Sequence, residues 1–216
     1  MDAQFWLERW KNREIGFHKA VVNPSLLAVQ KQLQLRSGQN VLVPLCGKSL
    51  DMIWFSQQGL QVTGVELASA ACEDFFSENQ LKVQKEEQGG YSVYSSDSIC
   101  LWCGDFFCFP ETQKFDLIYD RAATIALPES LRSNYFKKIQ SFLEMGARLC
   151  LITIEYDQSR LEGPPFSVSE TEIRNAFSQF KINKWSERVT PMDNLRFTEA
   201  GVEVTEKIYW ISQSGD

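Results

Sequence analysis

The sequence predicts an α/β fold, a doubly wound, mostly parallel sheet with helices on both faces. Short apolar runs of strand length alternate along the chain with segments of helical periodicity. Residues 40–66, NVLVPLCGKSLDMIWFSQQGLQVTGVE, are typical of strand, turn, helix and strand, closing on the carboxylate Glu66. Such alternation calls for right-handed crossovers, and these produce a parallel sheet.

The first half of the chain opens with two helices. Aromatic residues recur at helical spacing in the first segment, and Asn23-Pro24 is a cap and first-turn signal for the second. Gly59 then closes a helix between two apolar strands. We expect helices over 2–11, 24–35, 49–58 and 68–79, and strands over 41–45 and 61–66. Residues 91–95 and 98–103 form a hairpin, or the second run belongs to the main sheet.

The second half alternates again and ends on an antiparallel pair. Pro128 opens a helix that Gly146 stops, and Ser169 with Glu172 forms a capping box. We expect strands over 115–119 and 147–155, helices over 128–144 and 169–179, and an antiparallel pair of strands at the sheet edge over 181–189 and 202–211.

Composition narrows the classes of partner. The 216 residues suit one domain, and their net charge of −6 disfavours a nucleic acid partner. The N-terminus lacks the basic start and apolar stretch of a signal peptide, and no apolar run approaches about 18 residues. We therefore expect a cytoplasmic protein without a membrane or nucleic acid partner.

The six cysteines do not predict a metal site. Cys100 and Cys103 have C-x-x-C spacing, but they lie in a strand-like run where residues three apart point to opposite faces. No second pair completes a site, and His18 is the only histidine. We expect no metal.

The residues that follow each strand are the candidates for a ligand site, because parallel sheets bind ligands beyond the carboxyl ends of their strands. They are Leu45-Cys46-Gly47, Glu66-Leu67, Gly104-Asp105, Asp120-Arg121 and Glu155-Tyr156. The first turn has one glycine, not three, which favours a nucleoside without a pyrophosphate. Taken singly, Glu66 is also compatible with a solvent-facing acid, Arg121 with an ordinary ion pair, and Trp10 and His18 with structural roles.

Several motifs, in order along nearly the whole chain, carry a family resemblance. They are W-x-x-x-W with GFH (Trp6 to His18), VLVPLCGKS followed by GVE, KFDLIYDRAA, GPPF and the late EKIYWI. The chain resembles the thiopurine S-methyltransferases. That resemblance implies one S-adenosylmethionine-dependent domain over 1–216, with seven strands, the last antiparallel, and residues 1–36 as an N-terminal helical cover.

The resemblance also implies roles for single residues. It places Trp10, Leu45, Glu66, Gly104, Asp105 and Arg121 at the cofactor, with Glu66 on the ribose. Arg121 is also the expected catalytic residue. Phe17, His18 and Arg196 are the expected substrate contacts, and the substrate is a small aromatic or heterocyclic thiol.

The expected reaction needs little acid–base machinery. Methyl transfer from a sulfonium is an in-line displacement, so alignment of the nucleophile dominates. An acidic heterocyclic thiol ionises readily, and the Arg121 guanidinium would favour the anion. We expect a monomer. Selenium and tellurium species are further candidate substrates. A nicotinamide-dependent oxidoreductase and a non-catalytic nucleoside-binding protein are the alternatives.

Overall fold

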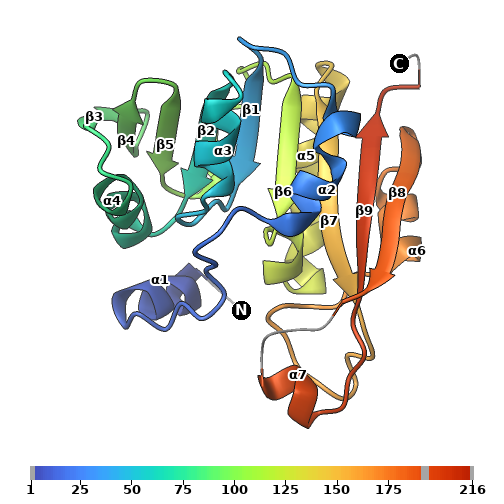
Figure 1. The fold of residues 1–216 in the computed structure, drawn as a ribbon. Coiled ribbons are helices and arrows are strands. Elements are labelled where there is room, and N and C mark those ends of the chain that lie inside the picture. Colours follow the sequence, from blue (N-terminus) through green and yellow to red (C-terminus); the bar gives the residue numbers. More distant parts are fainter. Residues whose placement is uncertain (1–2, 191–194, 215–216) are drawn as a thin grey trace. The chain divides into compact units, whose positions relative to one another are not determined.

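The computed structural model describes residues 3–190 and 195–214 (Figure 1). The chain divides into two compact units, Met1–Ile118 and Tyr119–Asp216. The division falls within strand β6 (Leu117–Arg121).

The described residues of the first unit form four α-helices and most of the strands. The helices are α1 (Ala3–Lys11), α2 (Pro24–Leu33), α3 (Asp51–Gln57) and α4 (Ser69–Glu78). The strands complete in this unit are β1 (Asn40–Pro44), β2 (Gln61–Glu66), β3 (Gln84–Gln88), β4 (Tyr91–Ser96) and β5 (Ile99–Cys103). A short 3-10 helix, η1 (Phe106–Cys108), follows β5.

The strands of this unit place the carboxyl ends of β1 and β2 side by side. β1 pairs in parallel with β2, with Pro44 opposite Val65, and also with the start of β6. β2 pairs in parallel with β5, with Glu66 opposite Cys103. β4 is antiparallel to β5, and β3 is antiparallel to β4. The run 98–103 therefore belongs both to a hairpin and to the parallel strands, so the two open interpretations hold together.

Local chemistry explains where these elements start and stop. Asn23 caps α2 by accepting from the backbone N–H groups of Ser25 and Leu26, as the Asn-Pro signal indicated. Gly59, at φ 83°, follows α3 in the left-handed conformation that ends a helix. The last four residues of β1 are buried, as expected of a central parallel strand.

The three strands that lie wholly in the second unit pair with one another in antiparallel fashion. Its strands are β7 (Arg148–Glu155), β8 (Lys181–Val189) and β9 (Thr205–Ser212), and its helices are η2 (Thr124–Ala126), α5 (Glu129–Glu144), α6 (Glu170–Ala176) and α7 (Leu195–Glu199). β9 is antiparallel to both β7 and β8. The α/β class and the antiparallel last strand are confirmed.

The expected count of seven strands is too low. The described residues form nine strands, including β3, whose five polar residues are all exposed. An exposed strand buries no apolar face, so it lacks the alternation by which a strand is recognised in a sequence. α7 was also not expected from the sequence.

The capping box of α6 is confirmed only in part. Ser169 Oγ accepts from the Glu172 backbone N–H at 3.1 Å, as predicted. The Glu172 carboxylate, however, binds the Arg132 guanidinium, with Nε–Oε1 at 2.6 Å. A buried arginine is a stronger partner than a backbone N–H at a helix start.

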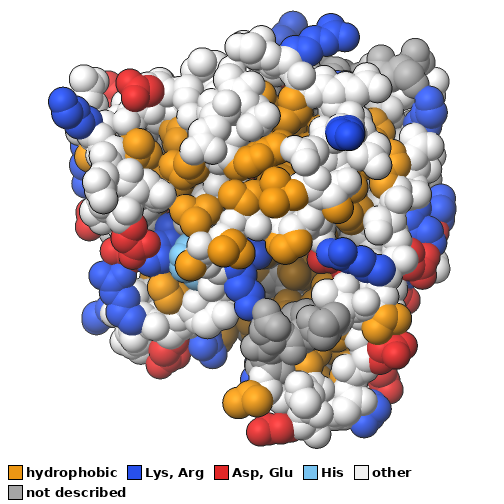
Figure 2. All heavy atoms as spheres, in the orientation of Figure 1, with side chains coloured by type: hydrophobic (Ala, Val, Ile, Leu, Met, Phe, Trp, Pro, Cys, Tyr) orange, Lys and Arg blue, Asp and Glu red, His pale blue; other side chains and the backbone are white. Residues whose placement is uncertain are grey.

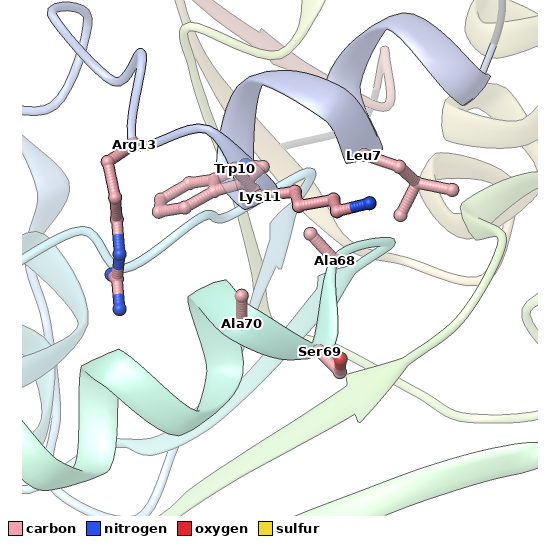
Figure 3. Close-up of a pocket in the computed structure, with 7 residues that line it drawn as sticks. All are labelled: Leu7, Trp10, Lys11, Arg13, Ala68, Ser69 and Ala70. Carbon is pink, nitrogen blue, oxygen red and sulfur yellow. The ribbon is translucent and has the colours of Figure 1, made fainter.

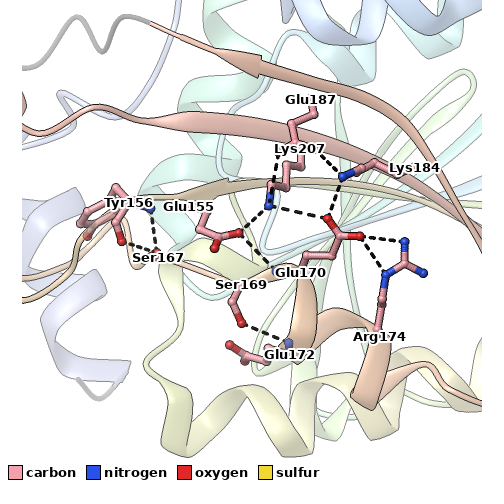
Figure 4. A network of polar contacts seen from close by, with 10 residues as sticks. All are labelled: Glu155, Tyr156, Ser167, Ser169, Glu170, Glu172, Arg174, Lys184, Glu187 and Lys207. Atoms are coloured by element: carbon pink, nitrogen blue, oxygen red, sulfur yellow. Dashed lines mark hydrogen bonds and ion pairs between the residues drawn. The ribbon is translucent and has the colours of Figure 1, made fainter.

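A charged cluster links α6 to the strands of the second unit (Figure 4). Glu170 binds Lys184 at 2.8 Å and Arg174 at 2.7 Å. The buried Lys207 ammonium binds Glu155 at 2.6 Å. The hydrogen bonds from Lys184 and Arg174 lower the pKa of the Glu170 carboxyl to about 2, and burial opposes that shift.

The surface carries charges of both signs. On the face in Figure 2, Lys and Arg side chains lie among Asp and Glu side chains rather than in one basic patch. Among the described residues, no helix combines the length and apolar character needed to cross a membrane.

Candidate active site

The turn after β1 has an unusual backbone that favours a close approach. Leu45 and Gly47 both have positive φ, 46° and 53°. A Cβ on Gly47 would lie 3.2 Å from the Trp10 indole, so a larger residue would push the ring away. Glycine thus allows Trp10 to lie directly on this turn.

The Glu66 carboxylate joins this turn to the start of α4. Its side chain is 6% exposed. Oε2 accepts from the Gly47 N–H and Oε1 from the Ala68 N–H, each at 2.8 Å. Burial raises the pKa of this carboxyl, and the backbone N–H groups oppose that rise. Each ionised oxygen keeps further acceptor capacity, so the group can receive two hydroxyl donors.

Trp10 lies on the wall of a hollow that is also lined by Ala68, whose N–H donates to Glu66. The buried indole packs with Ala68 and Ala71. Figure 3 shows Leu7, Trp10, Lys11 and Arg13 of the N-terminal segment facing residues 68–70 at the start of α4, around a cavity of about 360 Å³. Trp10 therefore packs in the core and at the same time lines the hollow.

Gly104 and Asp105 follow β5, and Gly104 contacts the backbone of Glu66. The Gly104 N–H donates to the Glu66 backbone carbonyl at 2.8 Å. A Cβ on Gly104 would lie 2.5 Å from the Tyr91 ring, whose hydroxyl donates to the Asp105 carbonyl at 2.8 Å. The exposed Asp105 carboxylate accepts from the Phe107 N–H and caps η1.

Tyr91 was missed by reasoning from the sequence. It supports the turn of Gly104 and Asp105 from β4, and only its position after Gly89-Gly90 set it apart in the sequence. An aromatic residue at a strand start has many roles, so no local signal distinguished this one.

Arg121 lies in the second unit, at the end of β6. The preceding Asp120 carboxylate is buried and accepts from the Thr124 N–H at 3.1 Å, the Thr124 hydroxyl at 2.5 Å and the Tyr135 hydroxyl at 2.8 Å. Burial raises the pKa of Asp120 in spite of these donors. Ala122 follows at φ 68°, in the left-handed region, so the chain turns sharply after Arg121.

The three expected substrate residues fall in different surroundings. Phe17 is 42% exposed and packs edge-on against Trp6 and Trp10, with centroids 5.4 and 5.6 Å away. His18 is half-buried, and its backbone N–H donates to the Ile15 carbonyl. Arg196, in α7 of the second unit, donates to the Glu162 carbonyl at 2.9 Å.

The first unit thus brings together most of the expected cofactor residues. Trp10 and Glu66 meet at the turn of Gly47, Gly104 binds the Glu66 backbone carbonyl, and Phe17 packs on Trp10. Arg121 and Arg196 come from the second unit. Within residues 3–190 and 195–214, no group of three or more His, Cys, Asp or Glu side chains is placed to hold a metal ion.

Solved structures with a similar fold include methyltransferases. The N1-methyltransferase for 1,6-didemethyltoxoflavin from Burkholderia thailandensis, solved with S-adenosylhomocysteine, matches with a TM-score of 0.63 and 15% identity, over 98% of this chain and 87% of its own. The magnesium protoporphyrin IX methyltransferase of Synechocystis, also with bound S-adenosylhomocysteine, matches with a TM-score of 0.63 and 16% identity, over 96% of this chain and 99% of its own.

Sequence relatives are much closer. The thiopurine S-methyltransferase of Pseudomonas putida is 43% identical over 216 residues, covering 99% of this chain and all of the relative. That of Pseudomonas fluorescens is 42% identical over 219 residues, covering all of this chain and 99% of the relative. The model of the thiopurine S-methyltransferase family matches residues 1–214. The chain belongs to the thiopurine S-methyltransferase family.

Proposed function

We propose that this protein transfers a methyl group from S-adenosylmethionine to the sulfur of small aromatic or heterocyclic thiols, thiopurines included. The observation that carries the proposal is the buried Glu66 carboxylate, which binds the Gly47 and Ala68 N–H groups at the ends of two parallel strands. Family membership and the S-adenosylhomocysteine bound to structural neighbours support the same cofactor.

The residues of the first unit fit an adenosyl group. A ribose offers two neighbouring hydroxyl donors, and the Glu66 carboxylate has one free acceptor position on each oxygen. A Cβ on Gly47 would press on the Trp10 ring and a Cβ on Gly104 on the Tyr91 ring, so both glycines let an aromatic ring lie close to a turn of the site. We assign Glu66 to the ribose, Gly104 and Asp105 to the adenine edge, and Leu45 to the methionine part.

When bound, S-adenosylmethionine supplies an activated methyl group on a sulfonium. The task of the protein is then to align the thiol, exclude water and stabilise the thiolate. Alignment alone can contribute about 7–11 kcal/mol to lowering the barrier. Trp10 and the N-terminal segment exclude water. The guanidinium of Arg121 favours the thiolate by its charge, and the buried Asp120 holds the turn that carries it.

Phe17, His18 and Arg196 are the proposed substrate contacts. An exposed aromatic ring and two groups able to donate hydrogen bonds suit a flat heterocycle bearing ring nitrogens. Selenium and tellurium species are further candidate substrates, since they are soft nucleophiles like a thiolate.

The remaining properties are also proposals. We propose a single-domain monomer in the cytoplasm that uses no metal and binds neither nucleic acid nor membrane. The net charge of −6 and the mixed charges of the visible face support the lack of a nucleic acid partner.

A substrate screen tests the reaction. Purified protein is incubated with radiolabelled methyl donor and a panel of thiols, phenols, amines and chalcogen oxyanions. Transfer of label to aryl thiols supports the proposal. Binding of the donor without transfer to any of the panel would instead support the non-catalytic nucleoside-binding alternative.

A further inference from the structure

Three segments of the first unit meet in one ion-pair network. The Asp74 carboxylate of α4 binds the Arg13 guanidinium and lies 3.5 Å from the Lys48 ammonium. Lys48 also binds Glu78, one turn further along α4, at 2.6 Å. Arg13 follows α1, and Lys48 follows Gly47, so the network connects the N-terminal segment, the turn after β1 and α4.

The same three segments surround the candidate cofactor site. They carry Trp10, Gly47 and Ala68, and the last two donate to Glu66. Helix α1 lies against α4, and Arg13 itself lines the hollow between them (Figure 3). A change in the network therefore acts on the wall that contains Trp10.

The two cations of the network differ in strength. Lys48 is 6% exposed and lies close to the carboxylates of Asp74 and Glu78, so the ion pair between Lys48 and Asp74 is shielded from water. The Arg13 side chain is 62% exposed, and ion pairs of this kind are weak. The contact that breaks most easily is thus the one that joins the N-terminal segment to α4.

The backbone at Arg13 indicates that its side chain matters. Arg13 has a φ of 59°, a left-handed conformation that costs free energy for a residue with a Cβ and that glycine adopts freely. Its N–H donates to the Trp10 carbonyl at 3.2 Å, so the residue ends α1. Glycine would serve this backbone better, and what arginine adds is the guanidinium on Asp74.

We propose that Arg13 and Asp74 form a latch, with Lys48 as its buried anchor, that holds α1 on α4 and keeps Trp10 over the bound cofactor. The three are positioning residues, and the inference rests on the proposed cofactor site. A weak closing contact suits a cover that must open at every turnover to release the spent cofactor.

Arg13→Ala and Arg13→Gly test the latch, with Arg9→Ala as the matched control. Arg9 belongs to the same segment, but its ion pair with Glu14, at 3.4 Å, does not reach α4. The first measurement is amide hydrogen exchange of residues 3–12 in the cofactor-free protein. The second is the rate at which S-adenosylhomocysteine dissociates, followed by stopped-flow fluorescence.

In both Arg13 variants, the amides of residues 3–12 should exchange about two- to fivefold faster than in wild type, and S-adenosylhomocysteine should dissociate faster by the same factor. This factor corresponds to the free energy of an exposed ion pair. Arg9→Ala should match wild type in both rates. Arg13→Gly should also melt no lower than wild type, because it relieves the left-handed backbone. A residue with a purely structural role would not combine retained stability with faster release. Arg13→Lys should bring the dissociation rate of S-adenosylhomocysteine part of the way back to that of wild type. Asp74→Asn should have the same effect as Arg13→Ala, because Lys48 still has Glu78 as its ion-pair partner in that variant.

Wild-type exchange and dissociation in Arg13→Gly would overturn the latch, and so would an equal effect in Arg9→Ala. The exchange measurement needs no cofactor. If wild-type protein fails to bind S-adenosylmethionine, the proposed function fails, while the exchange result still decides whether Arg13 and Asp74 hold α1.

Discussion

At the scale of single residues, the proposed cofactor site depends most on Glu66. Its carboxylate is buried and accepts from backbone N–H groups of two segments, the turn after β1 and the start of α4. A carboxylate held in this way has a fixed direction, and a fixed acceptor binds paired hydroxyl donors better than a mobile one.

Glu66→Gln should weaken the binding of S-adenosylmethionine about 10- to 100-fold. The amide keeps the shape, but one of its two ends donates instead of accepting, and hydrogen bonds to a charged group are worth about 1.5–3 kcal/mol. Isothermal calorimetry measures the affinity, with the exposed Glu86→Gln as control. Unchanged affinity in Glu66→Gln would remove the ribose assignment.

Arg121→Ala should lower kcat about 10- to 100-fold and change the cofactor affinity less, because the proposed role of the guanidinium is to stabilise the thiolate. The loss should shrink along a series of aryl thiols of falling pKa, since an acidic thiol ionises without help. Steady-state kinetics over that series measures the effect. A loss that stays constant along the series would rule out the electrostatic role.

At the scale of elements, two supports act from a distance. Tyr91 of β4 lies against Gly104 and its hydroxyl donates to the Asp105 carbonyl, so the strand next to β5 holds the turn after β5. Glu170, at the start of α6, binds Lys184 of β8 and joins that helix to the antiparallel strands.

The Glu170 cluster should make stability depend on pH. The pKa of the Glu170 carboxyl is lowered from 4.5 to about 2, so the ionised form of this group stabilises the fold. That contribution is present above about pH 4.5 and is lost as the pH falls towards 2. Glu170→Gln should therefore destabilise the protein near neutral pH by about 1 kcal/mol, in view of its partial exposure.

Urea denaturation at pH 7 and at pH 3 measures this difference. The gap between Glu170→Gln and wild type should narrow at the lower pH, whereas Glu203→Gln, in an exposed loop, should match wild type at both. A gap that is the same at pH 7 and pH 3 would contradict the assigned pKa shift.

At the scale of the whole molecule, the candidate residues divide along the chain. Those proposed for the adenosyl group, apart from Arg121, come before Ile118, while Arg121 and Arg196 come after it. The two arginines proposed to act on the thiol thus come from a later part of the sequence than the residues proposed to bind the adenosyl group.

Binding of the donor should stabilise the folded protein as a whole. S-adenosylmethionine at 100 times its dissociation constant should add about 2.7 kcal/mol. For a protein of this size, that corresponds to a rise in Tm of roughly 5–10 °C. Differential scanning fluorimetry measures the rise, with NAD as the control ligand. A rise with NAD and none with S-adenosylmethionine would favour the oxidoreductase alternative.

Much of this molecule is readable from its sequence. The alternation of apolar runs and helical periods predicted the α/β class, and the strand-end rule selected Glu66 and Gly104, which the structure connects. These features follow from local patterns, because the period of the side chains is set by the element that contains them. The motifs from Trp6 to Trp210 carried the family resemblance, and the comparisons confirm the family.

Other features were decided only by the tertiary structure. Arg13 binds Asp74, which is 61 positions away in the sequence. Arg132 binds the Glu172 carboxylate, 40 positions away, in place of the predicted capping contact. The Tyr91 ring lies against Gly104. β3 gave no periodic signal because all its residues are exposed. Such partners are chosen by how distant segments pack, and no local periodicity encodes that choice.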